Sequence, residues 1–203
     1  MNQLLKQVLL VLCMFALSGQ VIAGSLTDAA RTYDAGNYAD AAKQFRALAE
    51  QGNAVAQARL GVLYEQGRGV PQDFQEAYKW IRLSVAQGNA DAQFTLGWMY
   101  ELGEGVPQDI KEAINWYRLS AKQGNGFAQF SLGGMYAHGQ GVPKNFVAGH
   151  MWTNICAANA TDSDLLQLCT KLRDSLTKIM TSAQIAEAQE LARKCTANKF
   201  KGC

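Results

Sequence analysis

The sequence predicts an all-α protein: an α/α superhelical solenoid of helix-turn-helix repeats that ends in a C-terminal helical cap. Two observations carry this prediction. Residues 54–89 and 90–125 align without a gap and are identical at 22 of 36 positions, and a third copy runs from 126 to about 161. Within each copy, small and apolar residues recur at the spacing of one helix face in two successive segments. A 36-residue period is typical of solenoids built from helix pairs.

The first 23 residues have the parts of an export signal. Lys6 supplies the positive charge, residues 8–17 form an apolar run, and Val21-Ile22-Ala23 precedes the expected cleavage point. The apolar run is too short for a spanning helix. We therefore expect a periplasmic or secreted chain with no stable membrane insertion after cleavage. An uncleaved membrane tether is the alternative.

The repeat region begins after this signal. Residues 24–53 contain a degenerate first copy, which runs from about Leu26 to Asn53 and lacks the glycine-rich middle of the others, and residues 54–161 contain three full copies. The first helix of each full copy carries a glycine, at positions 61, 97 and 133. Glycine inside a helix costs about 1 kcal/mol. Its recurrence indicates that a neighbouring helix approaches closely at that point.

The connection between the two helices of a repeat combines glycines with a proline, as in residues 67–73. Gly67 suits a left-handed helix end, and Pro71 stops the first helix. The second helix then begins with an aspartate followed three residues later by a glutamate, which is a capping-box pattern at Asp73 and Asp109. The third copy has Asn145 without that glutamate, so we expect the weakest helix start there. On the second helix we expect one buried face, formed by Ala77, Trp80, Leu83 and Ser84 and their equivalents.

Residues 162–203 lose the period and are expected to form the cap, with helices at 164–178 and 182–198. Four cysteines remain after the signal, all in the last quarter of the chain: Cys156, Cys169, Cys195 and Cys203. In an exported chain they predict disulfides, and four cysteines allow three connectivities. We favour the two short-range pairs, Cys156–Cys169 and Cys195–Cys203. Redox or catalytic chemistry is the alternative role.

The motif Leu-Gly-x-x-Tyr-x-x-Gly-x-Gly-Val-Pro-x-Asp, followed by Ala-x-x-Trp, resembles the Sel1-like repeat, a relative of the tetratricopeptide repeat. The resemblance covers residues 54–161 closely and 26–53 loosely. The segment 180–195 is similar to the closing segment of bacterial exported members. The resemblance implies an adaptor or regulator in protein complexes.

Several kinds of chemistry find no support in the sequence. The net charge is only +2, without a basic stripe, so we expect no nucleic-acid partner. The two histidines, His138 and His150, lack further ligands at metal-site spacing, so we expect no metal and no cofactor. We expect His138 on the surface at the end of the first helix of its repeat, and His150 on an exposed or half-buried side of the second helix. We expect no enzyme activity. The alternative is a cell-wall or β-lactam-acting hydrolase, because a cysteine-rich subfamily of similar repeats is linked to β-lactams, but the repeats here hold no cysteine before Cys156.

The residues that differ between copies predict where a protein or peptide partner binds. By analogy with tetratricopeptide arrays, the inner groove is lined by one side of each first helix. In the second and third full copies this side is rich in aromatic residues, and exposed apolar patches of that kind mark binding sites. The alternative for the two phenylalanines at 94 and 130 is packing between neighbouring helices. The expected groove residues are Asp91, Phe94, Trp98, Glu101, Leu102, Phe127, Phe130 and His138.

Overall fold

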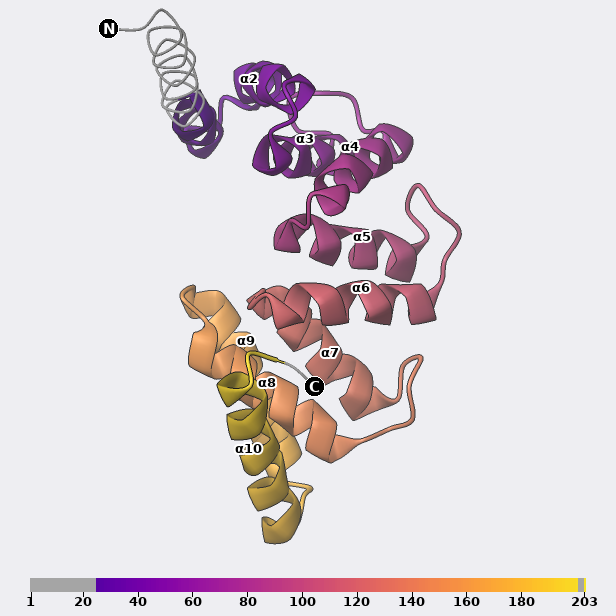
Figure 1. Cartoon of the computed structure of the whole chain (residues 1–203), viewed down its shortest axis with the longest axis vertical. Helices are drawn as coiled ribbons and strands as arrows, with labels where there is room; N and C mark the ends of the chain where they lie inside the picture. Colours follow the sequence, from indigo (N-terminus) through magenta and orange to yellow (C-terminus); the bar gives the residue numbers. More distant parts are fainter. Residues whose placement is uncertain (1–24, 201–202) are drawn as a thin grey trace, which may run out of the picture. The chain divides into compact units, whose positions relative to one another are not determined.

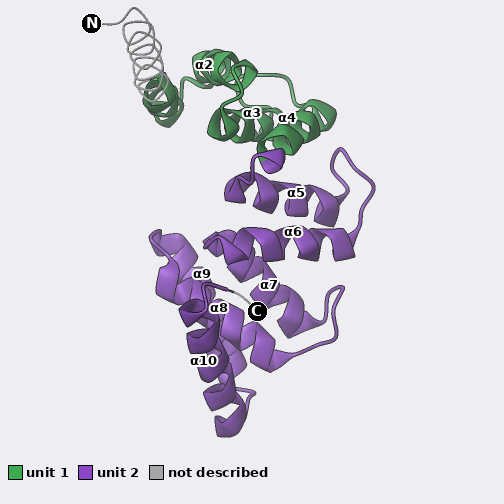
Figure 2. Ribbon diagram, viewed as in Figure 1, with its two compact units in different colours: residues 1–84 green, residues 85–203 purple. Residues whose placement is uncertain are grey.

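The computed structural model describes residues 25–200 and 203, and these residues contain helices and connections but no strand. The expected export signal at residues 1–23 lies outside the described residues. No helix in the described part is both long and apolar enough to cross a membrane. The chain divides into two compact units, residues 1–84 and 85–203 (Figure 2). Each unit is described by itself.

The first unit holds the degenerate copy and the first full repeat. A helical segment at residues 25–34 and α2 (Tyr38–Glu50) form the degenerate copy. They are followed by α3 (Ala54–Gln66) and α4 (Phe74–Ala86), of which residues 74–84 belong to this unit. α2 packs against α3. The core of this unit includes the fully buried side chains of Phe45, Leu60, Leu63 and Ile81.

The second unit contains two full repeats and the cap (Figure 1). The repeats are the helix pairs α5 (Ala90–Leu102) with α6 (Ile110–Lys122) and α7 (Gly126–His138) with α8 (Phe146–Asn159). The cap consists of α9 (Ser163–Thr177) and α10 (Ser182–Ala197), within one residue of the expected bounds. α6 packs against α7, and both cap helices pack against α8.

The recurring glycine of the first helix marks a close contact within each repeat. A Cβ at Gly97 would lie 2.7 Å from the Cδ1 atom of Tyr117, and a Cβ at Gly133 would lie 2.5 Å from the Cγ2 atom of Thr153. Real Cβ atoms essentially never approach another atom so closely. The expected close approach is therefore confirmed, and the neighbouring helix is the second helix of the same repeat.

In α4 the face expected from the sequence is buried except at Leu83. Leu83 is 45% exposed, whereas Ile81 and Tyr117 are completely buried. These two side chains lie opposite the recurring glycine of the first helix, where the missing side chain leaves space for them. The prediction for Leu83 was wrong because residue 81, four positions after Ala77, shares its helix face, while residue 83 does not. The expected burial of Trp80 and Trp152 is confirmed, whereas their equivalent Trp116 is only partly buried.

The connections end the first helix and start the second as expected, with one correction. Gly103 adopts a left-handed conformation (φ 77°) at the end of α5. Asp109 caps α6 through its side chain, which accepts hydrogen bonds from the backbone N–H groups of Lys111 and Glu112. The reciprocal bond of a capping box is not made, because the Asp109 N–H donates to the Tyr100 carbonyl at 2.9 Å.

The same backbone bond recurs in the third repeat, where the Asn145 N–H donates to the Tyr136 carbonyl at 2.8 Å. The Asn145 side chain accepts one bond, from Ala148 N–H, where Asp109 accepts two. The start of α8 thus has one side-chain cap bond fewer than the start of α6. The missing glutamate is not the reason, because the glutamate of α6 makes no capping-box bond either. A complete capping box does form in the cap, between Thr181 and Gln184.

Two disulfides hold the cap, and they are the pairs favoured from the sequence. Cys156–Cys169 joins α8 to α9, with the Cα atoms 5.9 Å apart. Cys195–Cys203 joins α10 to the last residue, with the Cα atoms 5.8 Å apart. Cys156, Cys169 and Cys195 are buried, and Phe200 packs beside the second pair against the core of the unit.

Candidate functional site

The expected groove residues lie on α5 and α7, both in the second unit, and they differ in exposure. Position 98 is the most informative, because its equivalents in the other full repeats are Val62 and Gly134 and only here is it a large side chain. The exposed members of the set are Asp91, Trp98, Leu102, Phe127 and His138, and the partly buried members are Phe94, Glu101 and Phe130.

Four of these residues form a connected apolar surface. The Phe94 ring lies 5.8 Å from the Phe127 ring, which joins α5 to α7. Trp98 and Leu102 follow Phe94 at successive four-residue steps along α5, so all three share one side of the helix. Trp98 is 40% exposed and Phe127 is 47% exposed. We call Phe94, Trp98, Leu102 and Phe127 the Trp98 surface.

Phe94 anchors this surface to the core. Its ring also lies 5.6 Å from that of Tyr117, which is completely buried on α6. Phe94 therefore packs between neighbouring helices, in contact with Tyr117 of α6 and Phe127 of α7. The packing interpretation is confirmed for this residue, and its place in a binding groove stays a prediction.

Phe130 has a different environment from Phe94. It packs against the buried cluster of Cys156, Leu165 and Cys169, which includes the disulfide between α8 and α9. Packing accounts for Phe130, and α9 is the element that covers it. Sequence reasoning had no means of finding this contact, since α9 has no counterpart in the repeats.

Two carboxylates on α5 carry negative charge beside the Trp98 surface. Asp91 accepts a hydrogen bond from the side-chain amide of Asn125 at 2.8 Å. Glu101 accepts one from the Tyr117 hydroxyl at 2.6 Å. Burial raises the pKa of Tyr117 far above its usual value, and the hydrogen bond to Glu101 raises it further. The phenol therefore keeps its proton and donates to Glu101, and within the described residues neither carboxylate forms an ion pair.

The two histidines are not placed alike. His138 is exposed in the last turn of α7, as expected. His150 was expected on an exposed or half-buried side, but it is only 2% exposed, on the packed side of α8. Its Nε2 atom lies 3.2 Å from the Thr177 hydroxyl of α9, and burial lowers its pKa. This prediction was wrong because the cap helix that covers His150 lies outside the repeat pattern.

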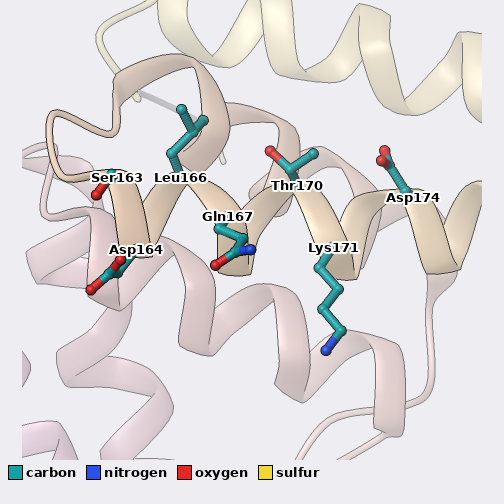
Figure 3. Close-up of a pocket in the computed structure, with 7 residues that line it drawn as sticks. All are labelled: Ser163, Asp164, Leu166, Gln167, Thr170, Lys171 and Asp174. Atoms are coloured by element: carbon teal, nitrogen blue, oxygen red, sulfur yellow. The ribbon is translucent and has the colours of Figure 1, made fainter.

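Other surfaces offer less to a ligand. The shallow pocket on α9 is lined from Ser163 to Asp174 by side chains of a single helix (Figure 3). Figure 3 shows these side chains leaving the helix in different directions rather than converging. No group of three metal-binding side chains lies together among the described residues.

The one Ser-x-x-Lys sequence runs from Ser175 in the last turn of α9 to its C-cap residue Lys178, and both side chains are exposed. Such a spacing occurs in enzymes with a serine nucleophile. The Ser175 hydroxyl donates to the backbone carbonyl of Lys171 at 2.8 Å, a local bond within the helix. A serine held in this way is not in contact with an acid–base partner.

Comparison with known proteins identifies the repeats and the fold. The Sel1 repeat model matches residues 54–89, 90–125 and 126–155. A crystal structure of a Sel1 repeat protein from Oxalobacter formigenes superposes with a TM-score of 0.64 at 22% identity, covering 86% of this chain and 88% of that one. No curated protein matches this chain.

A second similar structure is a protective antigen present in uropathogenic Escherichia coli strains, which displays the same repeat fold. It superposes with a TM-score of 0.62 at 24% identity and covers 91% of this chain. The chain spans about half the length of that protein, 48%. At these identities the likeness shows the fold, a solenoid of helix pairs.

Proposed function

Because the chain belongs to the Sel1 repeat family, we propose that it is an exported interaction scaffold that binds a protein or peptide on the Trp98 surface. Repeat arrays of this kind present extended binding surfaces. The proposal assigns no catalytic step to the chain. The alternative, a hydrolase acting on β-lactams or cell-wall material, predicts turnover of a chromogenic β-lactam by the purified protein, above that of a heat-inactivated sample.

The observation that carries this proposal is a tryptophan 40% exposed at a position where packing requires no bulk. The equivalent residue in α7 is Gly134, where an added Cβ would meet no atom within 4 Å. Trp98 therefore fills no gap in the core of its repeat. Large aromatic side chains that are exposed in the free protein dominate the binding energy of interfaces, and the adjoining Leu102 and Phe127 extend the apolar area.

The cysteine pairs support export. Disulfides persist in the periplasm and outside the cell and are rare in the cytosol. One pair joins the last repeat helix, α8, to the cap helix α9, and the other pair lies within the cap. The sequence of residues 1–23, with Lys6 before an apolar run, also favours export.

The test places a photo-crosslinking amino acid at residue 102, inside the Trp98 surface, or at residue 119 on α6. Leu119 is a matched control, since it is 46% exposed and lies outside the surface. We expect one partner to crosslink at residue 102 and not at residue 119. The Trp98→Ala substitution should remove that crosslink, because loss of an aromatic anchor costs about 2 kcal/mol or more in binding free energy.

Circular dichroism and the unfolding midpoint of Trp98→Ala serve as the folding control. Crosslinking that is equal at both positions, or unchanged by Trp98→Ala in a folded protein, would show that the Trp98 surface is not the binding site.

A further inference from the structure

We infer that the partner segment recognised by the Trp98 surface is cationic, with lysine or arginine side chains next to an apolar residue. This inference deepens the proposed function and rests on it. It concerns only α5 and α7, which lie in one unit, and it follows from the charges on these two helices.

The two helices that carry the Trp98 surface contain neither lysine nor arginine, whereas α6 contains Lys111, Arg118 and Lys122. The whole chain has a net charge of +2. The acidic character of this face is therefore local, and it opposes the sign of the molecule as a whole.

The acidic groups of this face are fixed in place without being neutralised. Asp91 is held by the amide of Asn125, and Glu101 is held by the hydroxyl of Tyr117. Both donors are neutral groups, so within the described residues neither carboxylate is paired with a cation. A carboxylate that is already held in one position loses little side-chain freedom when a cation binds, which reduces the entropy cost of binding.

The apolar part of the surface also favours a cation. The face of a tryptophan ring attracts an ammonium or guanidinium group, and tryptophan is the strongest of the aromatic residues in this respect. Trp98 lies on α5 between Asp91 and Glu101. It precedes Glu101 by three positions, so it shares a side of the helix with that carboxylate. A lysine or arginine placed there contacts the ring and the carboxylate together, while an adjacent apolar side chain packs on Leu102 or Phe127.

The test begins with a random linear peptide library displayed on phage and selected on the purified protein at low ionic strength. The Trp98→Ala variant serves as the counter-selection, so only sequences that depend on the surface survive. We expect the surviving sequences to carry net positive charge beside an aliphatic or aromatic residue. Survivors that are neutral or acidic would overturn the cationic inference and leave the proposed function standing. If no sequence depends on Trp98, both fail.

Synthetic versions of the surviving peptides then measure the role of charge. Glu101→Gln and Asp91→Asn remove one charge each but keep an acceptor for Tyr117 and for Asn125. Each should weaken binding about two- to fivefold, the range of exposed charge pairs. Glu112→Gln removes an exposed carboxylate on α6 and should change nothing.

Binding should also weaken as salt is added, and this loss should be smaller in the Glu101→Gln variant. Equal affinities for the wild type and both charge variants would overturn the cationic inference.

Discussion

Two adjacent glycines in α7 should respond to the same substitution in opposite directions. Gly133 and Gly134 are both helical, and alanine gains about 1 kcal/mol over glycine in a helix interior. At Gly134 an added Cβ meets no atom within 4 Å. Gly134→Ala should therefore stabilise the protein by about 0.5–1 kcal/mol.

At Gly133 the same methyl group lies 2.5 Å from the Cγ2 atom of Thr153. Thr153 cannot change its rotamer without breaking a hydrogen bond. Its hydroxyl donates to the carbonyl of Gly149 at 3.0 Å and lies 3.1 Å from the carbonyl of His150. Overpacking of a tight core costs about 1–3 kcal/mol, and the restrained threonine places this site near the upper end. After the helix gain is subtracted, Gly133→Ala should destabilise the protein by about 1–2 kcal/mol.

The assay is urea unfolding followed by circular dichroism, with the disulfides intact in all three proteins. The difference between the two variants should be about 1.5–3 kcal/mol, with unchanged dependence on urea concentration. A shift of both midpoints in the same direction would refute the argument, because it would mean that the contact between α7 and α8 relaxes at no cost. Gly134 is thus the matched control for Gly133.

Two further predictions concern a helix cap and a buried histidine. Asp109→Ala should cost about 1 kcal/mol of stability in urea unfolding, because it removes the side-chain cap of α6. Glu112→Gln should leave the urea midpoint unchanged, since no capping-box bond depends on that carboxylate; a loss as large as that of Asp109→Ala would contradict the observed cap. His150 should make stability fall as the pH drops below about 6.5, because its pKa is lowered in the folded state, so the unfolded chain binds the proton more readily. His150→Gln should flatten this part of the pH profile, and an identical slope in both proteins would show that His150 is not responsible.

The features that could be predicted from the sequence are local ones. The glycine at residue 103 and the aspartate at residue 109 act within one helix turn, so the residue type alone determines their role. The repeat period determined the helix pairs, because it shows which residues are equivalent before any contact is known. The cysteine pairs followed from their short separation along the chain.

The candidate site could be predicted only in part. Exposure at Trp98 and Leu102 agrees with the expectation from the repeat comparison. Position 98 is valine, tryptophan or glycine in the three full repeats, so packing does not require a large side chain there. The charges on Asp91 and Glu101 could be read from the sequence. Their neutral partners, Asn125 and Tyr117, could not, since both belong to elements later in the chain.

The sequence by itself determined the helix pairs, their connections and their caps, because these depend on neighbours within a few residues. Only the tertiary structure decided which side chains are covered. It buried Tyr117 beneath the recurring glycine, placed Phe130 under α9, and enclosed His150 beside Thr177. Each of these outcomes depends on a helix that is distant in sequence. Burial of a side chain is set by the helix that packs over it in the folded protein, and local sequence does not identify that helix.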